Sequence, residues 1–138
     1  MTDTTKGPEV KGGLVAYLQV RNAAEASAFY QKAFGATVAA SYPPDEQGRT
    51  MHIHLYVNGS SLMLGDAYPE HGCPHENPAG YNLTLMVEDA DAWANRAVAA
   101  GATVAMPVQD MFWGDRYGQV RDPQGVLWSF NQPLNKAA

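Results

Sequence analysis

Two histidines and several polar aromatic residues recur at every second position in the N-terminal half of this 138-residue chain. His52, His54 and Tyr56 alternate along one predicted strand, and Tyr17 and Gln19 alternate along an earlier one. Side chains two residues apart on a strand point to the same face of a sheet. Imidazole, amide and phenol groups on an aromatic wall can orient and stack a small molecule, so this face is a candidate ligand site.

The C-terminal half carries a second group of polar and aromatic candidates. The segment 111–117 crowds large aromatic groups and one fixed charge between two predicted strands, a mixture that a pocket mouth requires. The candidate ligand-binding residues of this half are Asn82, Trp113, Arg116, Tyr117 and Ser129. In the structural alternative, both groups lie on half-solvated sheet faces, Asp115 and Arg116 form an ion pair, and Trp113 packs beneath the turn. An exposed ion pair contributes only about 0 to 1 kcal/mol.

Metal binding and nucleophilic catalysis are the other chemistries that these residue types allow. No carboxylate accompanies His52 and His54 on their face, which favours hydrogen bonding over metal coordination. The segment 71–76 holds two histidines, a cysteine and a glutamate, but it lacks the CxxC or HExxH spacing of a metal site and is expected to be a solvated loop. Cys73 has no base close in sequence, so we expect no nucleophilic role for it.

An internal repeat organises these candidates. The pentapeptide Gly-Ala-Thr-Val-Ala occurs at 35–39 and again at 101–105, and each copy closes a stretch that has the apolar spacing of an amphipathic helix. Asn22 and Asp89 are the predicted N-caps, and Gly35 supplies a left-handed stop. Strands are predicted over 14–20, 37–42, 49–57, 61–64, 81–87, 103–108, 115–121 and 126–131. The order is βαβββ, twice.

Parity along the strands separates a core face from the candidate face. Apolar residues occupy the alternate positions and are predicted to lie beneath the helices. They are Leu14, Ala16, Leu18, Val20, Met51, Ile53, Leu55, Val57, Leu83, Leu85, Val87, Val126, Trp128 and Phe130. Trp128 is therefore assigned to the core, although its residue type would suit a pocket.

Composition and charge exclude some classes of binding partner and indicate a location. The net charge is −5 and the chain has no basic cluster, so a nucleic-acid partner is not expected. No apolar run approaches the roughly 20 residues of a membrane span. The single cysteine cannot form an intrachain disulfide, and residues 1–10 lack the pattern of a secretion signal, so we expect a cytoplasmic protein.

The repeated βαβββ order, Phe29-Tyr30 in the first helix and Asp122-Pro-Gln-Gly125 before the last strand resemble the vicinal oxygen chelate superfamily of glyoxalases, extradiol dioxygenases and bleomycin-resistance proteins. The octapeptide Met-Phe-Trp-Gly-Asp-Arg-Tyr-Gly at 111–118 is similar to the PhnB-like branch. The resemblance covers nearly the whole chain. It implies a single α+β domain over 1–138, with half-units at about 13–66 and 80–132, a linker at 67–79, mixed sheets forming a concave cup, helices outside, and a homodimer.

The resemblance also bears on metal use. In metal-using members, the ligands come from the first and last strands of both units, and the corresponding positions here are Val15, Met63, Asn82 and Ser129. Val and Met offer no hard donor, and Asn and Ser are poor neutral ligands for zinc, nickel or iron. We therefore expect no metal and no other cofactor.

The expected function is metal-independent binding of a planar or aromatic small molecule, in the manner of bleomycin-resistance proteins. The expected stacking groups are Tyr17, Tyr56 and Trp113, and the expected orienting groups are Gln19, His52 and Asn82. One alternative is a glyoxalase- or dioxygenase-like lyase or isomerase with a non-standard site around His52 and His54. Another is a non-catalytic subunit with a vestigial cavity.

Overall fold

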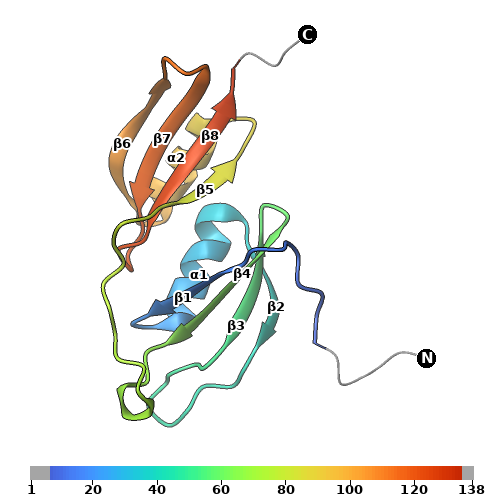
Figure 1. Ribbon diagram of the computed structural model, residues 1–138, viewed down its shortest axis with the longest axis vertical. Helices are drawn as coiled ribbons and strands as arrows, with labels where there is room; N and C mark the ends of the chain where they lie inside the picture. Colours follow the sequence, from blue (N-terminus) through green and yellow to red (C-terminus); the bar gives the residue numbers. More distant parts are fainter. Residues whose placement is uncertain (1–6, 135–138) are drawn as a thin grey trace, which may run out of the picture. The chain divides into compact units, whose positions relative to one another are not determined.

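A computed structural model of the chain describes residues 7–134 and divides them into two compact units. Unit 1 takes in the residues up to Gln31 together with Gly35–Glu76. Unit 2 takes in Lys32–Phe34 and the residues from Asn77 onward. Each unit contains one sheet, and each sheet is accompanied by one helix (Figure 1).

Unit 1 is built from four strands and one helix, followed by a single turn of 3-10 helix. The elements are β1 (Ala16–Val20), α1 (Ala23–Phe34), β2 (Thr37–Ser41), β3 (Ile53–Val57), β4 (Ser60–Asp66) and η1 (Pro69–His71). The strand order is β1-β4-β3-β2, with β1 parallel to β4 and the other pairs antiparallel. The sheet is therefore mixed. The Asn58-Gly59 turn joins β3 to β4 with φ of 49° and 83°, the positive values predicted for a tight hairpin.

Unit 2 repeats this architecture. Its elements are β5 (Leu83–Met86), α2 (Ala90–Ala100), β6 (Thr103–Asp110), β7 (Asp115–Arg121) and β8 (Leu127–Pro133). The strand order β5-β8-β7-β6 matches that of unit 1. The registers also match, because Tyr17 lies opposite Met63 across β1 and β4, as Thr84 lies opposite Ser129 across β5 and β8. The predicted α+β fold with two βαβββ units is confirmed.

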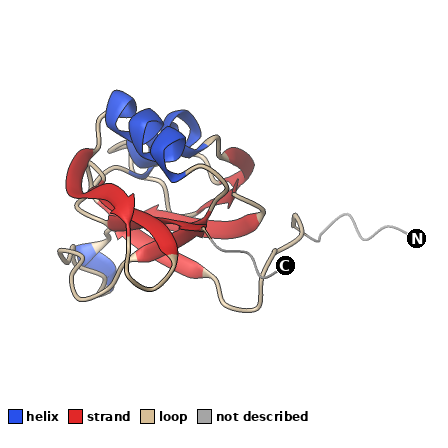
Figure 2. Cartoon of the chain, turned by 90° about the horizontal axis from the view of Figure 1, so that it is seen from above, coloured by secondary structure: helices blue, strands red, loops and turns tan. Residues whose placement is uncertain are grey.

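The helix ends follow the sequence signals. The Asn22 side chain accepts a hydrogen bond from the Glu25 backbone N–H at 3.1 Å, and the Asp89 side chain accepts one from Ala92 at 3.1 Å. Gly35 ends α1 with φ of 68°, in the left-handed region that glycine tolerates best. Helices α1 and α2 each lie to one side of the strands of their own unit (Figure 2). No helix in residues 7–134 is long and apolar enough to span a membrane.

A second contact at each helix start is also repeated. The carboxylate of Asp66, at the end of β4, accepts hydrogen bonds from the backbone N–H groups of Ala23 at 3.2 Å and Thr50 at 2.7 Å. In unit 2, the side-chain carbonyl of Gln132 in β8 accepts a hydrogen bond from the Ala90 N–H at 3.0 Å. Both acceptors satisfy a first-turn N–H that has no partner within its own helix.

The parity prediction of the core holds for most of the predicted positions and fails for two residues that precede β1 and β3. The predicted core residues that are buried are Leu18, Val20, Ile53, Leu55, Val57, Leu85, Val87, Val126, Trp128 and Phe130. Ala16 and Leu83 are half-buried. The core assignment of Leu14 and Met51 was wrong, since their side chains are 96% and 54% exposed. Strands β1 and β3 begin only at Ala16 and Ile53, so strand alternation does not apply to residues 14 and 51.

Candidate functional site

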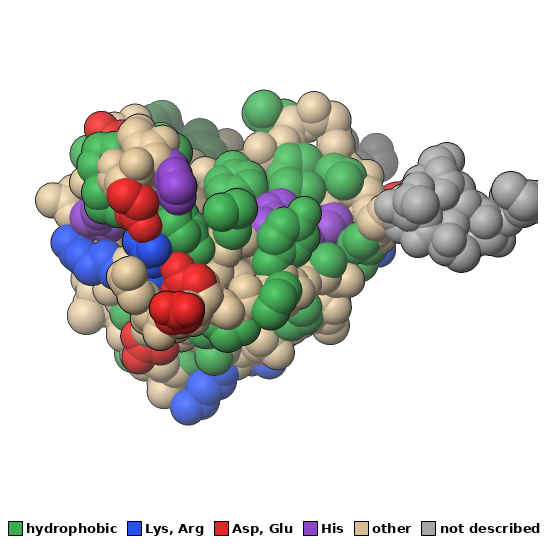
Figure 3. Space-filling model, turned by 90° about the horizontal axis from the view of Figure 1, so that it is seen from below, with side chains coloured by type: hydrophobic (Ala, Val, Ile, Leu, Met, Phe, Trp, Pro, Cys, Tyr) green, Lys and Arg blue, Asp and Glu red, His purple; other side chains and the backbone are tan. Residues whose placement is uncertain are grey.

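A cluster of exposed rings surrounds His52 in unit 1. The Tyr17 ring stacks on His52 with centroids 5.6 Å apart and an interplanar angle of 28°, and Tyr42 approaches the same imidazole edge-on at 5.5 Å. Tyr17, Tyr42 and Met51 are all more than half exposed. We call Tyr17, Tyr42, Met51 and His52 the tyrosine–histidine cluster. Figure 3 shows one face of the molecule, on which histidine side chains lie among hydrophobic ones.

Hydrogen bonds fix the orientation of the Tyr17 and His52 rings. The Tyr17 hydroxyl donates to the Met51 backbone carbonyl at 2.9 Å and lies 3.1 Å from His52 Nδ1. A phenol has one hydrogen and a carbonyl can only accept, so both contacts are satisfied when Nδ1–H donates to the Tyr17 oxygen. The neutral imidazole then keeps Nε2 as an acceptor. Burial, followed by the nearby Tyr42 and Tyr68, raises the pKa of Tyr17, which keeps its hydroxyl protonated.

Gly65 of β4 makes this close approach possible. A Cβ at this position would lie 2.4 Å from the Met51 carbonyl oxygen and 3.1 Å from the Tyr17 hydroxyl. The first distance is shorter than any Cβ contact can be without movement of the backbone. Gly65 is therefore a positioning residue of the cluster. Its only sequence signal is a glycine next to a strand pattern, which often marks a close backbone approach.

His54 and Tyr56 lie on the same face of β3, and each forms a hydrogen bond within the protein. His54 is 2% exposed, its Nε2 lies 2.7 Å from the Ser61 hydroxyl, and its ring meets Tyr56 edge-on. Burial, followed by the nearby His52, lowers the pKa of His54, so its imidazole is neutral at pH 7. The Tyr56 hydroxyl donates to the Glu9 carbonyl at 2.7 Å.

A groove of about 370 Å³ adjoins the tyrosine–histidine cluster and shares Tyr42 and Met51 with it. Its lining residues are Tyr42, Pro43, Asp45, Arg49, Met51, Tyr68 and His71. Apolar and aromatic groups predominate in this set, as in small-molecule sites. Met51 precedes β3, which begins at Ile53, so strand parity could not place Met51 in this groove.

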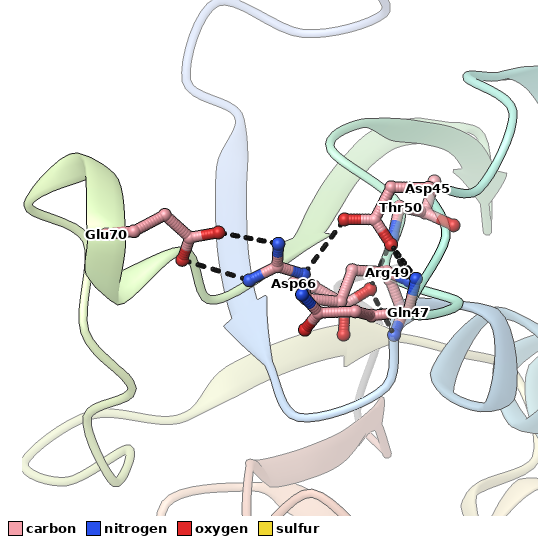
Figure 4. A network of polar contacts seen from close by, with 7 residues as sticks. Asp45, Gln47, Arg49, Thr50, Asp66 and Glu70 are labelled. Atoms are coloured by element: carbon pink, nitrogen blue, oxygen red, sulfur yellow. Dashed lines mark hydrogen bonds and ion pairs between the residues drawn. The ribbon is translucent and has the colours of Figure 1, made fainter.

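Arg49 holds the walls of the groove together (Figure 4). Its guanidinium donates to Asp45 at 2.9 Å and to both carboxylate oxygens of Glu70 at 3.0 and 2.6 Å, and it lies over the Tyr68 ring at 4.4 Å. The hydrogen bonds from Arg49 lower the pKa of Glu70 to about 2. The loop before β3 is thereby tied to η1 across the groove.

We call the face of each sheet that is opposite to its core face the inward face. On the inward face of unit 2, neutral side chains hydrogen-bond to one another in a chain. The Gln119 amide donates to the Tyr117 hydroxyl at 3.0 Å, which donates to the Ser129 hydroxyl at 2.8 Å. Ser129 is fully buried and donates to the Asn82 side-chain oxygen at 2.8 Å. The Thr84 hydroxyl donates to the same oxygen at 2.9 Å. The structure thus brings Asn82, Tyr117 and Ser129 together.

Trp113 and Arg116 differ in their placement. Trp113 is 49% exposed and meets the Tyr117 ring edge-on at 5.6 Å. Arg116 lies on the opposite face of β7 from Tyr117, where it pairs with Asp91 of α2 at 2.6 Å and with Asp110 at 2.8 Å. The alternative pairing with Asp115 is wrong, because these two carboxylates take its place. Arg116 is therefore separated from the other candidates of unit 2.

The residues at the superfamily's metal positions do not suit a metal ion. Val15 and Met63 offer no oxygen or nitrogen donor, while the oxygens of Asn82 and Ser129 are joined by the hydrogen bond described above. Within residues 7–134, no three His, Cys, Asp or Glu side chains come together in a way that could hold a metal. Cys73 is exposed, and its sulfur lies 3.9 Å from the His71 carbonyl.

Comparison with known proteins agrees with this fold. A family model described as "Glyoxalase/Bleomycin resistance protein/Dioxygenase superfamily" matches residues 13–130. The uncharacterized protein Rv0887c of Mycobacterium tuberculosis is 40% identical over 138 residues, covering 96% of this chain and 81% of its own length.

Solved structures show the same likeness. Protein PA1353 of Pseudomonas aeruginosa has a TM-score of 0.72 at 30% identity, covering 87% of this chain and 96% of its own. A PhnB protein of Bacillus cereus has a TM-score of 0.69 at 21% identity, covering 88% of this chain and 99% of its own, and so shares the fold. The chain belongs to the glyoxalase/bleomycin resistance protein/dioxygenase superfamily.

Proposed function

We propose that this superfamily member binds a planar, aromatic small molecule on the tyrosine–histidine cluster of unit 1 and sequesters it without a metal ion. The observation that supports this most strongly is the juxtaposition of exposed, oriented rings with a groove of about 370 Å³. Pockets for small molecules have volumes of about 300 to 1,000 Å³ and combine apolar walls with a few placed polar groups. The groove and the cluster together have this composition.

Stacking and one directed hydrogen bond would provide the affinity. Each aromatic pair contributes about 0.5 to 1.5 kcal/mol beyond its buried area. Tyr17 is already held by Met51 and His52, so its ordering adds little cost on binding. His52 Nε2 would accept a hydrogen bond, which favours a ligand that carries an N–H or O–H group on its ring.

The remaining candidates have smaller proposed roles. Gln19 is half-buried on the inward face of β1 and could add one amide contact. In unit 2, the exposed Trp113 ring meets the half-buried Tyr117 ring edge-on. The other candidates are bonded within the protein as described above, and we propose no direct stacking role for them.

Metal independence is part of the proposal. His52 Nδ1 is joined to Tyr17 and His54 Nε2 to Ser61, so each imidazole has a protein partner on one nitrogen. A catalytic metal site needs about three protein ligands, and these two histidines have no carboxylate or thiol beside them in the described chain.

One observation favours a second candidate function, a lyase or isomerase with His52 as general base. A base is commonly oriented by a hydrogen bond to its second nitrogen, and Tyr17 occupies that position. Whether the protein converts its ligand distinguishes the two functions. A bound ligand recovered chemically unchanged after long incubation supports sequestration, whereas conversion that is lost in His52→Gln supports the enzyme.

Assembly and location complete the proposal. Each sheet has two edge strands, β1 and β2 in unit 1 and β5 and β6 in unit 2, and pairing of chains would cover such edges. We therefore propose a homodimer. We also propose a cytoplasmic location, because the single cysteine, Cys73, is a free thiol. Light scattering that gives the mass of one chain, 14.9 kDa, at micromolar concentration would contradict the dimer.

A thermal-shift screen of planar aromatic and heteroaromatic compounds, run in the presence of EDTA, tests the binding function. Hits are expected to stabilise wild-type protein and Phe112→Ala, which removes a 97% exposed ring outside the cluster. The same hits should lose their effect in Tyr17→Ala. Hits that act only after metal is added, or that stabilise Tyr17→Ala as well as wild type, would overturn the proposal.

A further inference from the structure

The two units differ at one corner of their inward faces. Tyr56 lies opposite Ser61 across β3 and β4, and Arg121 lies opposite Leu127 across β7 and β8, so these pairs are counterparts in the repeat. In unit 1 the corner is covered by residues 9–11. Ser61 exchanges hydrogen bonds with Lys11 in both directions, at 2.7 and 2.9 Å, and the Lys11 ammonium lies 4.2 Å from the centre of the Tyr56 ring.

The corresponding corner of unit 2 is open. A pocket of about 410 Å³ lies there, and the chain segment before β5 forms part of its wall rather than filling it. The lining residues are Pro78, Ala79, Gly80, Tyr81, Asn82, Arg121, Gly125 and Leu127. We call this the Arg121 pocket.

Arg121 brings an uncompensated positive charge to this pocket. One of its terminal N–H groups donates to the Gly125 carbonyl at 2.8 Å, which fixes the guanidinium. No carboxylate in residues 7–134 forms an ion pair with it. Arg49 and Arg116, by contrast, each contact two carboxylates. A guanidinium has five N–H donors, so Arg121 retains donors for an anion.

Asn82 adds a second, oriented donor to the Arg121 pocket. Its side-chain oxygen accepts hydrogen bonds from Thr84 and Ser129, at 2.9 and 2.8 Å. Because that oxygen is held by two hydroxyl groups, the orientation of the amide is fixed and its NH₂ group is directed away from them. Asn82 thus links the closed hydrogen-bond chain to the pocket wall.

We propose that the Arg121 pocket binds the carboxylate of a small organic acid, with Arg121 and Asn82 as donors. The planar fork of a guanidinium matches the two oxygens of a carboxylate. Tyr81, which is 48% exposed, and Leu127 supply an apolar wall for the body of the acid. This site uses no residue of the tyrosine–histidine cluster, so its test is independent of the function proposed above.

Benzoate and its neutral analogue benzamide are matched probes for this site. In a ¹H–¹⁵N correlation NMR titration of the full chain, millimolar benzoate is expected to shift the amide signals of Gly80, Asn82 and Leu127 in a saturable way. Benzamide is expected to shift them far less, because it lacks the negative charge. Equal binding of the two probes would overturn the proposal.

Two variants test the donors. Arg121→Gln and Asn82→Asp should each weaken benzoate binding at least tenfold, equivalent to about 1.4 kcal/mol. Asn82→Asp retains an oxygen for Thr84 and Ser129 but replaces the donor with a negative charge. The control Arg96→Gln alters an exposed arginine whose Nε donates to the Lys32 carbonyl at 2.8 Å, and it should bind benzoate like wild type. Unchanged affinity in a folded Arg121→Gln, shown by a dispersed spectrum, would refute the site.

Discussion

The inward faces of the two units are built on the same strand order but carry different kinds of side chain. In unit 1 the face presents exposed tyrosines around His52, and in unit 2 it presents a closed chain of neutral hydrogen bonds that ends at the buried Ser129. In both units a side chain caps the start of the helix, the strand order is the same, and the registers of β1 with β4 and of β5 with β8 correspond. The repeat therefore preserves what folding requires and allows inward positions to diverge.

Individual counterparts show how far this divergence goes. Tyr17 of β1 corresponds to Thr84 of β5, and Met63 of β4 corresponds to Ser129 of β8. One unit has a large ring and a thioether where the other has two hydroxyl groups. Aromatic rings suit stacking, whereas the small hydroxyls satisfy their neighbours. We infer that unit 1 carries the aromatic site because its Tyr17 and Tyr42 rings remain more than half exposed, whereas Ser129 of unit 2 is fully buried.

The largest effect is expected from removal of the unit 2 core. Trp128 is 2% exposed and donates from Nε1 to the buried Asp122 at 2.9 Å. Trp128→Ala should lower the free energy of unfolding by about 3 to 5 kcal/mol, because it leaves a void and removes a hydrogen bond to a buried carboxylate. Denaturant unfolding measures this change.

Two exposed rings are matched controls for Trp128→Ala. Trp113→Ala and Tyr17→Ala each remove a ring that is about half exposed, and each should cost less than about 1 kcal/mol. If Tyr17→Ala unfolds the protein while Trp128→Ala is tolerated, the inward and core faces have been assigned the wrong way round.

An intermediate effect is expected at the positioning glycine of unit 1. Gly65→Ala places a methyl group against the Met51 carbonyl and should cost about 1 to 3 kcal/mol, as overpacking does. It should also displace Tyr17 from His52. Gly13→Ala is the control, because a Cβ there meets nothing within 4 Å. Equal melting temperatures for the two variants would show that Gly65 does not constrain the cluster.

The smallest effect is a pH dependence carried by unit 1. The folded pKa of His54 lies below its ordinary value of 6.5, so the unfolded chain takes up a proton first as the pH falls. The contribution of neutral His54 is fully present above pH 6.5 and is lost as the pH falls toward the folded pKa. Stability measured between about pH 7 and pH 5 should fall less steeply in His54→Gln than in wild type. Parallel curves would contradict this.

Much of the fold could be predicted from local signals. The apolar spacing of both helices, the caps Asn22 and Asp89, and the Asn58-Gly59 turn are each specified by a few neighbouring residues. The repeated pentapeptide then revealed the duplication. Element bounds were less accurate: the strand predicted from residue 49 begins only at Ile53, where its pairing with β2 and β4 begins.

The site was predictable only in part. Parity placed Tyr17 and His52 on one face, but it could not show that Gly65 permits their approach or that Met51 turns outward. Nor could it show that Arg116 pairs with Asp91, because that contact joins a strand to a helix 25 positions away. Such contacts depend on tertiary packing, which a single-strand pattern does not contain.

The most direct test of the central claim is an affinity measurement on the tyrosine–histidine cluster. The strongest compound from the EDTA-containing screen would be titrated calorimetrically into wild type, Tyr17→Phe and Tyr17→Ala. Tyr17→Phe retains the ring and loses the hydrogen bonds to Met51 and His52, whereas Tyr17→Ala loses the ring as well as these hydrogen bonds. We predict that Tyr17→Ala binds at least tenfold more weakly than wild type, about 1.4 kcal/mol, and that Tyr17→Phe lies between them. Equal affinity in all three proteins would contradict a stacking site in unit 1.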